Sequence, residues 1–277
     1  MQTAGKIVVV TGASMGIGEA IAAEFAAQGA SVVLSARDAI RLEAARLRVA
    51  TSGQAIAVPA DVTKPEDLAR LLEATLARFG RVDVWVNNAG HGLMDSISQV
   101  DLNQCRRMFE TNLFAVIQAM QLVVPVMRKQ ASGTIVNISS VAGYIAVPYM
   151  GAYGATKHAL NAVTKAARME LAGTGVKVCN VCPGYIATDF AVNAVKGKER
   201  YRLGVAARTG ITPAQVARVV LKAYLKNKRE VVVPGKDRLF IWLYQFAPWI
   251  VEGMMRRMLR PADEVIAQAA AVRGKKS

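Results

Sequence analysis

Short apolar runs rich in β-branched residues alternate with longer stretches rich in alanine and leucine along most of this chain. Seven of the apolar runs have the length and composition of strands: residues 7–10, 31–36, 55–59, 82–86, 134–139, 176–181 and 230–233. Most are almost wholly apolar, as expected for strands that helices cover on both faces. The alternation predicts repeated β-α units and an α/β fold with a doubly wound parallel seven-stranded sheet, the Rossmann fold.

We expect one Rossmann-type domain over residues 1–236 and an apolar and basic helical extension over residues 237–277. Inside the domain, Thr63 is the expected N-cap of a helix, with Glu66 three residues later. Residues 189–210 are polar and basic and contain no apolar run, so we expect a mobile insertion or lid without a strand there.

Composition limits the compartment and the partners. The chain has 277 residues, of which 53% are hydrophobic, and no apolar run of transmembrane length stands out. No basic and apolar leader precedes the first strand, and three cysteines are too few for a disulfide framework. We therefore expect a cytoplasmic protein. Its net charge is +15, but the basic clusters lack the interleaved aromatic residues of a nucleic-acid surface, so we expect no nucleic-acid partner.

Cys179 and Cys182 form a C-x-x-C pattern that a redox or metal site would need. They lie in a predicted buried strand, where residues three apart point to opposite faces of the sheet. His91 and His158 are the only histidines. We therefore expect two core cysteines and no metal site.

A glycine-rich loop follows the first predicted strand and opens a helix that begins near Ile17. Its sequence is Thr11-Gly12-Ala13-Ser14-Met15-Gly16-Ile17-Gly18. A pyrophosphate needs a turn without side chains and the free N–H groups of a helix N-terminus, and this segment supplies both. Because the sequence predicts a strand before the loop and a helix after it, the loop is a predicted dinucleotide site.

The end of the second predicted strand bears on which dinucleotide binds. An acidic residue there would hold the ribose 2′-OH of NAD and repel a 2′-phosphate. This chain has Ala36 and Arg37 instead, with Arg41 one turn later. A guanidinium can bind the phosphate through a planar fork. NADP(H) is therefore favoured over NAD(H), although Asp38 weakens the argument.

Tyr153 and Lys157 stand four residues apart, and Tyr153 follows Ser140 by thirteen residues. Residues i and i+4 share one face of a helix, so the ammonium can lie beside the phenol. A neighbouring cation lowers the pKa of a phenol, which makes Tyr153 usable as a general acid or base. Ser139 competes with Ser140 for a role beside it, but the spacing favours Ser140.

Together these motifs resemble the short-chain dehydrogenase/reductase family, in its compact single-domain branch, over residues 5 to 233. The matching cofactor positions are the loop from Gly12 to Gly18, then Asp61, Val62, Asn87, Asn88, Ala89 and Gly90, and finally Pro183, Gly184, Ile186 and Thr188. Asn112, Ser140, Tyr153 and Lys157 fall at the catalytic positions of the family. Arg37 is a further expected cofactor-binding residue, because it follows the second predicted strand and can bind a 2′-phosphate.

The resemblance implies hydride transfer between nicotinamide and a carbonyl carbon. Tyr153 would protonate the developing alkoxide, and Ser140 would hold the carbonyl oxygen. Lys157 would lower the pKa of Tyr153 and bind the nicotinamide ribose. Asn112, on a helix from about residue 103 to 129, would hold a water that links Lys157 to solvent. The family also implies a homodimer or homotetramer formed through the long helices.

The C-terminal segment lies outside these motifs. Leu239, Trp242, Leu243 and Phe246 form one helical stripe with little polar face opposite, which predicts a buried or apolar-sided helix that Pro248 breaks. Nearby arginines and tryptophans indicate an interface. It would cover the substrate cavity, pack on another subunit or rest on an anionic membrane. Each reading favours a small hydrophobic carbonyl or alcohol substrate of steroid-, lipid- or aromatic-like character.

The leading hypothesis is an NADP(H)-dependent carbonyl reductase. The alternatives are a cofactor-binding regulator without turnover and a membrane-surface protein on the same fold. The paired Tyr153 and Lys157 favour the enzyme, because a regulator needs neither.

Overall fold

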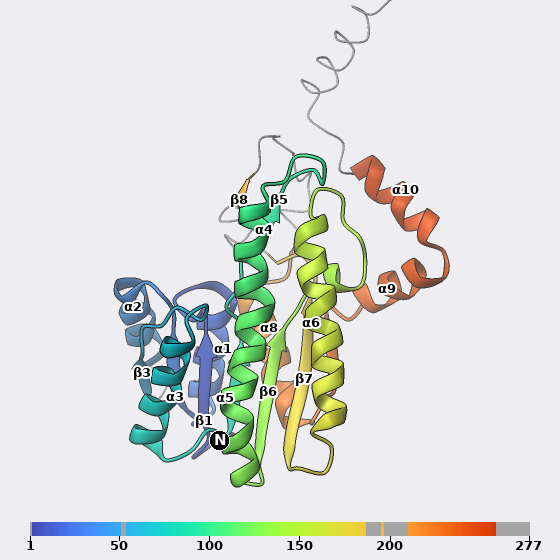
Figure 1. The fold of residues 1–277 in the computed structure, drawn as a ribbon. Helices are drawn as coiled ribbons and strands as arrows, with labels where there is room; N and C mark the ends of the chain where they lie inside the picture. The colour runs from blue at the N-terminus through green and yellow to red at the C-terminus, as the bar shows by residue number, and fades with distance from the viewer. Residues whose placement is uncertain (1, 51–53, 187–194, 197–209, 259–277) are drawn as a thin grey trace, which may run out of the picture.

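The computed structural model describes residues 2–50, 54–186, 195–196 and 210–258 (Figure 1). Its main sheet has seven parallel strands in the order β3-β2-β1-β4-β6-β7-β9. The strands are β1 (Ile7–Thr11), β2 (Ser31–Ser35), β3 (Ala55–Ala57), β4 (Val84–Asn87), β6 (Gly133–Ile138), β7 (Val176–Pro183) and β9 (Glu230–Val233). Each predicted run overlaps one of these strands, so the predicted Rossmann sheet is confirmed.

The order of the strands reverses between β1 and β4. From β1 the chain moves outward through β2 to β3, and it then returns to build β4, β6, β7 and β9 on the other side. Val8 pairs with Val84 and Val10 with Val86 across this junction. In open parallel sheets the ligand site lies outside the carboxyl ends of the strands at such a reversal.

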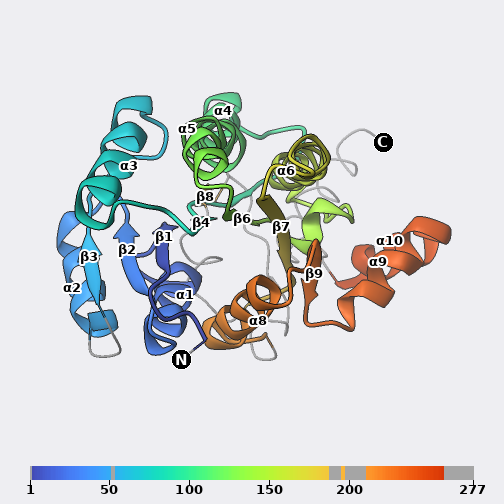
Figure 2. The same cartoon turned by 90° about the horizontal axis from the view of Figure 1, so that it is seen from below.

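Helices cover both faces of the sheet (Figure 2). One face carries α1 (Gly16–Ala27), α2 (Ala39–Ala50) and α8 (Pro213–Leu225), and the other carries α3 (Pro65–Phe79), α5 (Ala115–Lys129) and α6 (Gly151–Glu170). Two large apolar clusters result, with Phe25 fully buried in the first and Trp85 in the second. Each buried side chain of this size stabilises the fold by roughly 1.5–3 kcal/mol.

The predicted long helix before β6 is present but is interrupted. It consists of α4 (Leu102–Phe109), one π-helical turn (Glu110–Phe114) and α5. The segment Leu102–Lys129 is long and apolar enough to cross a membrane, which corrects the expectation that no such segment exists. However, Met108, Val123 and Met127 are fully buried, and the last two pack against the sheet, so the fold explains part of the apolarity of this helix.

Two local predictions are wrong. The N-cap of α3 is Lys64 and not Thr63, because Pro65 takes the first helical position, for which its fixed φ suits it. Thr63 instead donates from Oγ1 to Asp61 Oδ1 at 2.8 Å. Within the region expected to lack strands, β8 (Val195–Lys196) pairs with β5 (Leu93–Met94) in a separate two-stranded ladder. The rest of the expected insertion, apart from Gly210, lies outside the described residues.

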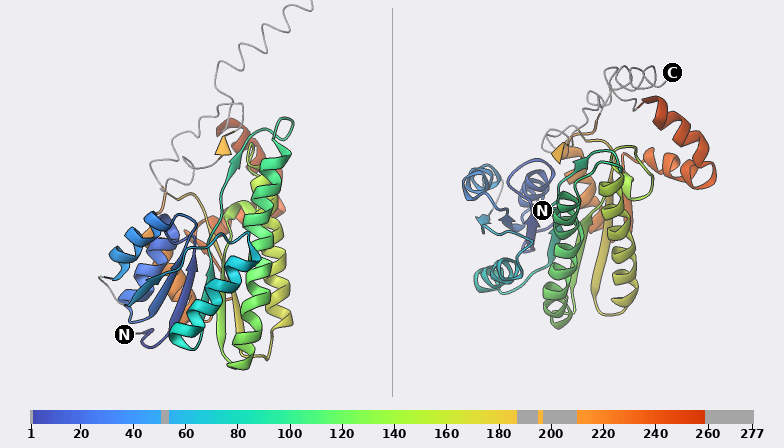
Figure 3. Two further views of the ribbon diagram at one scale, coloured as in Figure 1. Left: turned by 60° about the vertical axis from the view of Figure 1, so that its left-hand side comes forward. Right: turned by 45° about the horizontal axis from the view of Figure 1, so that its top comes forward.

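The C-terminal segment forms two helices beyond the edge strand β9 (Figure 3). They are α9 (Asp237–Phe246) and α10 (Pro248–Met258), and they meet at Ala247, so the predicted break at Pro248 is confirmed. Phe240, Ile241 and Tyr244 of α9 pack in one apolar cluster with the segment after β6, which contains Tyr144 and Ile145. The outward side of α9 stays apolar and exposed.

Candidate active site

The predicted site residues meet at the carboxyl edge of the sheet. Thr11 ends β1, Asn88 follows β4, Ser140 follows β6 and Pro183 ends β7. Arg37 follows the end of β2 at the same edge. This convergence follows from the parallel sheet, because all of its strands end on one side.

The glycine loop leaves space where a ligand can approach. Gly16 has a φ of 62°, and a side chain built on it would meet no atom within 4 Å. Gly18 is packed instead, since its side chain would lie 2.5 Å from Asn88 Nδ2. Met15 is the exposed N-cap of α1 and makes no side-chain capping bond, while Ser14 and Ile17 are half-buried. The first N–H groups of α1 thus face an open, side-chain-free turn that fits a pyrophosphate.

Asn88 braces this loop from the neighbouring strand. Its Nδ2 donates to Thr11 O at 2.9 Å and to Gly12 O at 3.1 Å. The backbone N–H groups of Asn88 and Ala89 both donate to Thr11 Oγ1, at 3.1 and 3.2 Å. The loop is therefore fixed in shape before any ligand binds. Gly90, the last residue of the motif, is exposed.

Arg37 and its neighbours lie at the expected adenosine end. Arg37 is exposed and makes no hydrogen bond or ion pair with any residue that the structure describes. Arg41, expected as a second donor, is paired with Asp38, with Nε 3.4 Å from Oδ2. This pairing turns Asp38 toward Arg41. Arg37 is thus the cation at this strand end that is available to a phosphate.

Asp61 and Val62, the predicted adenine contacts, follow β3. Val62 is buried. The backbone N–H of Asp61 donates to Asp67 Oδ2 at 2.8 Å, and its carboxylate accepts from Thr63. The bond from Asp61 N and the Arg70 guanidinium hold the pKa of the Asp67 carboxyl below its usual range. The turn is therefore rigid.

Tyr153 and Ser140 are in direct contact. The Tyr153 side chain is buried, and its hydroxyl is hydrogen-bonded to the Ser140 side chain. Ser140 Oγ accepts from Ala142 N at 3.1 Å and reaches Pro183 O at 3.4 Å. Lys157, one turn along α6, places Nζ 5.8 Å from the centre of the Tyr153 ring and donates to Ile138 O at 2.9 Å. The three predicted side chains form one cluster.

The electrostatics of this cluster differ from the expectation in one respect. Burial raises the pKa of Tyr153 to about 12, and the hydrogen bond from Ser140 only partly opposes it. Burial also lowers the pKa of Lys157 to about 8. The expected lowering of the phenol pKa by Lys157 is therefore wrong for this state of the protein. Loss of water is the largest cause of the raised Tyr153 pKa, and the Lys157 Nζ donates to the carbonyl of Ile138.

Ser139 points away from Tyr153. Its hydroxyl donates to Asn161 Oδ1 at 2.6 Å, and Asn161 also accepts from Asn180 Nδ2 and donates to Gly143 O. Neighbouring residues of a strand face opposite ways, and the choice of Ser140 follows this rule. Asn161 itself was missed. It lies four residues after Lys157, so the same helical spacing that links Tyr153 to Lys157 would have found it.

Asn112 lies in the π-helical turn and is almost fully buried. Its Nδ2 donates to His91 O at 3.0 Å and to Thr156 Oγ1 at 3.2 Å, and its Oδ1 accepts from His91 N at 3.1 Å. Asn112 therefore joins the loop after β4 to α6. The imidazole of His91 is half-buried, and burial lowers its pKa, as do Arg37, Arg107 and Lys157.

The predicted nicotinamide loop begins at the end of β7. Gly184 N donates to Val233 O at 2.8 Å, and the Asp237 carboxylate of α9 fills the space where a side chain at Gly184 would lie. Ile186 forms an isolated bridge with Ile211. Thr188 lies outside the described residues.

Cys179 and Cys182 are both buried, free thiols. They belong to different apolar clusters, on opposite faces of β7, and burial raises the pKa of each to about 12. Across the described ranges, no three His, Cys, Asp or Glu side chains are grouped to hold a metal ion. The predicted core role fits this arrangement.

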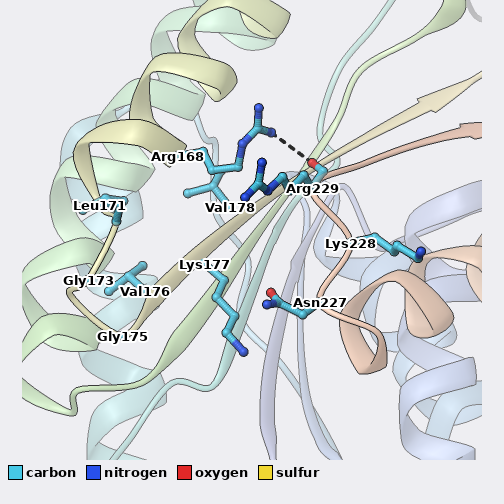
Figure 4. A pocket seen from close by; sticks show the side chains of 11 residues that line it. Arg168, Leu171, Gly173, Gly175, Val176, Lys177, Val178, Asn227, Lys228 and Arg229 are labelled. Carbon is cyan, nitrogen blue, oxygen red and sulfur yellow. Dashed lines mark hydrogen bonds between the residues drawn. The ribbon is translucent and has the colours of Figure 1, made fainter.

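A separate cavity of about 280 Å³ opens at the amino end of β7, at the opposite end of the sheet (Figure 4). Its lining includes Arg168, Lys177, Lys228 and Arg229 and no carboxylate. Arg168 Nη1 donates to Arg229 O at 3.1 Å, so its head is held by the backbone. The cavity contributes nothing to the cluster around Tyr153.

Comparisons with known proteins agree with this geometry. A family model described as short chain dehydrogenase matches residues 6–199. D-beta-hydroxybutyrate dehydrogenase of Rhizobium meliloti is 34% identical over 241 residues, which cover 86% of this chain and 91% of that protein.

Two solved structures show the same fold. A short chain dehydrogenase/reductase from Burkholderia phymatum in complex with NAD has a TM-score of 0.82 at 27% identity, and the match covers 88% of this chain and 94% of that one. A metagenomic short-chain oxidoreductase in complex with NADP has a TM-score of 0.71 at 32% identity, with 84% and 98% covered.

Proposed function

The chain belongs to the short-chain dehydrogenase family, and from this premise we propose that it is an NADP(H)-dependent reductase of a hydrophobic ketone. An oxidoreductase with a nicotinamide cofactor follows from the family. The phosphorylated form of the cofactor, the direction of the reaction and the class of substrate are the proposal. The observation that carries it is the contact between the Tyr153 and Ser140 side chains, at the same edge of the sheet as the open glycine loop.

When bound, the nicotinamide supplies the hydride that the carbonyl carbon accepts. The residues of the chain handle the oxygen and the proton. Ser140 Oγ donates a hydrogen bond to the carbonyl oxygen and fixes its position, while Tyr153 gives its phenolic proton to the same oxygen as negative charge develops. The alcohol leaves, and the phenolate takes a proton from solvent.

The protonation states suit reduction. A phenol with a pKa of about 12 is protonated at neutral pH and is ready to donate. The Lys157 ammonium, 5.8 Å from the Tyr153 ring, then stabilises the phenolate that remains. Asn112 acts through neighbouring residues, because its side chain bonds the backbone of His91 and the hydroxyl of Thr156 on α6. It is therefore a positioning residue.

The preference for NADP(H) rests on Arg37. Its guanidinium is exposed at the end of β2, and Arg41 neutralises the nearby carboxylate of Asp38. A 2′-phosphate can therefore gain a bidentate partner there without facing an unpaired acid. The preference for a hydrophobic substrate rests on the surroundings of Tyr153, which packs with Leu93, Met108 and Ala142.

Assembly as a homodimer or homotetramer is part of the same proposal. Only 39% of the most apolar window of Leu102–Lys129 is buried within one chain, and Phe114 is exposed on it. A second copy is the partner expected to cover such a helix in this family.

The test compares the wild type with Tyr153→Phe under excess NADPH. The panel holds steroid, aromatic and long-chain ketones and one short keto acid, the class that matches the Rhizobium relative by name. We expect turnover of the hydrophobic ketones and a loss of roughly 10²- to 10⁴-fold in Tyr153→Phe, because a general acid is removed. NADPH affinity should be unchanged.

Cofactor choice is measured on the same proteins by the quenching of Trp emission or by cofactor fluorescence. Arg37→Glu should weaken NADPH binding roughly tenfold or more and leave NADH binding nearly constant, because a favourable charge-assisted bond becomes a repulsion. Tight NADPH binding with no turnover of any ketone would favour the regulator. Preference for the short keto acid would overturn the substrate class alone.

A further inference from the structure

The C-terminal hairpin of α9 and α10 carries an apolar patch on its outer side. We define this patch by Leu239, Trp242, Phe246, Trp249, Ile250 and Met254, all of which are exposed. Trp242 is 54% exposed and Trp249 66%, although tryptophan is among the most strongly buried residues on average. The Trp242 and Phe246 rings lie 4.8 Å apart, so the aromatic surface is continuous there.

The apolar clusters of the described residues do not include this patch. Ile241 and Val251, on the inner side of the hairpin, are buried, and Phe240, Tyr244 and Met255 pack with the cluster around Tyr144 and Ile145. The hairpin is thus anchored by one side, and its other side is exposed in the part of the chain that the structure describes. Contiguous exposed apolar surface with a polar rim marks an interaction site.

Positive charge surrounds the apolar patch. Arg238, Arg256 and Arg257 are exposed on the same two helices, as is Lys236 just before them, against one exposed acid, Glu252. Trp and Phe beside Lys and Arg are the residues that helices use to lie in the headgroup layer of a membrane. We propose that the hairpin binds the surface of an anionic phospholipid bilayer through the apolar patch and these cations.

Charge also argues against the other occupant, a second copy of the hairpin. A symmetric dimer through this patch would bring Arg238, Arg256 and Arg257 of one chain toward the same residues of the other. Only Glu252 is an exposed acid on the two helices, so these cations would meet few opposite charges across such a contact. An anionic bilayer meets the same surface with complementary charge. The proposal concerns binding alone and stands whether or not ketone reduction is confirmed.

The test uses the full chain and two kinds of vesicles, phosphatidylcholine alone and phosphatidylcholine mixed with phosphatidylglycerol. Co-sedimentation should occur with the anionic vesicles and decrease as salt is added. Tryptophan emission gives a second readout. The chain has three tryptophans, and Trp85 is fully buried, so a blue shift on adding vesicles reports on Trp242 and Trp249.

Two variants probe the two parts of the surface. Trp242→Gln with Trp249→Gln should reduce binding to anionic vesicles roughly tenfold or more, since both apolar anchors are lost. Arg256→Gln with Arg257→Gln should reduce it roughly thirtyfold on anionic vesicles and change little on neutral ones.

Two matched controls replace the same kinds of side chain, two exposed apolar residues or two cations, by Gln at other places on the surface. Leu47→Gln with Met169→Gln removes two equally exposed apolar side chains from α2 and α6, and Lys177→Gln with Lys228→Gln removes two cations at the opposite end of the sheet. Both controls should bind vesicles as the wild type does. Absence of wild-type binding, or equal losses in controls and test variants, would overturn the proposal. If the wild type does not bind vesicles and the double tryptophan variant has a lower molar mass in solution, the patch is a contact with a second copy.

Discussion

At the scale of single residues, burial sets the chemistry of Tyr153 and Lys157. Each side chain is almost fully removed from water, and each therefore favours its neutral form. For Tyr153 this keeps the proton that a reductase needs. For Lys157 it makes the charged form unfavourable in the folded chain, although the proposed reaction uses that charge. The pair is thus placed for function at the expense of stability.

Lys157→Met should make the cofactor-free protein more stable and less active. At pH 7 the substitution removes a buried ammonium, and we expect the free energy of unfolding to rise by about 1–3 kcal/mol. The pKa of Lys157 is about 8 in the folded protein and near 10.5 in the unfolded chain, so between these values the unfolded state binds more protons. Wild-type stability therefore rises with pH above 8, and the advantage of the variant shrinks.

Denaturant unfolding from pH 7 to 10 measures this difference. Lys165→Met is the control, since Lys165 lies 4.8 Å over the Tyr144 ring and is only half-buried. It should lose at most about 1 kcal/mol, because only the contact with the Tyr144 ring is removed. A Lys157 variant that is less stable than the wild type at pH 7 would contradict the buried-charge argument.

Sequence spacing predicted which residues would meet but not what surrounds them. The four-residue step from Tyr153 to Lys157 and the thirteen-residue step from Ser140 identified three side chains that lie together in the fold. The direction of the Tyr153 pKa was missed, because burial depends on residues far away in the chain, such as Leu93 and Met108. Asn161 was missed although the four-residue step from Lys157 indicates it; only its partners, which come from three other segments, lie beyond that step.

At the scale of elements, the π-helical turn before α5 places Asn112. A single extra residue in a helix produces such a turn, and it rotates the residues within it. Deleting Thr111 should restore a continuous α-helix and withdraw Asn112 from His91 and Thr156. We expect little loss of helical circular dichroism but a fall in turnover of roughly tenfold or more, because the loop after β4 loses its anchor.

Thr111→Ala is the control for the deletion. It removes only the bond from Thr111 Oγ1 to Arg107 O and keeps the extra residue. Its turnover should match that of the wild type. Unchanged turnover in the deletion would show that the π-helical turn has no part in positioning the site.

The seven strands were predictable because each is an apolar run between recognisable turns. The ladder between β5 and β8 was not, because two residues have no pattern of their own and their partners lie about one hundred positions apart. The prediction of the α3 N-cap was wrong because two local rules competed. Thr63 fits a capping box, but Pro65 favours the first helical position and moves the cap to Lys64.

At the scale of the whole molecule, the long helix and the C-terminal hairpin expose two different apolar surfaces. We assign the first to a second copy and the second to a bilayer. Phe114→Lys should therefore lower the molar mass of the protein in solution, because it puts a charge on the apolar helix surface proposed as the subunit contact. Light scattering after size exclusion measures the mass. Vesicle binding through the apolar patch should be retained by the variant.

Trp242→Lys is the matched control for the mass measurement, because it adds the same charge to the other surface. Its mass should equal that of the wild type. If Trp242→Lys dissociates the protein and Phe114→Lys does not, the two surfaces are assigned the wrong way round. The sequence alone left these assignments open, because it shows that a helix is apolar but not which side the fold covers.

The contact between Gly184 and Asp237 ties together the evolution of two regions. The Asp237 carboxylate occupies the place of a side chain at position 184, so neither residue can enlarge unless the other retreats. Across descendants of this chain, a substitution in the loop after β7 should be accompanied by a change at the start of α9. Because the start of α9 contacts this loop, its sequence should change more slowly than the rest of the hairpin.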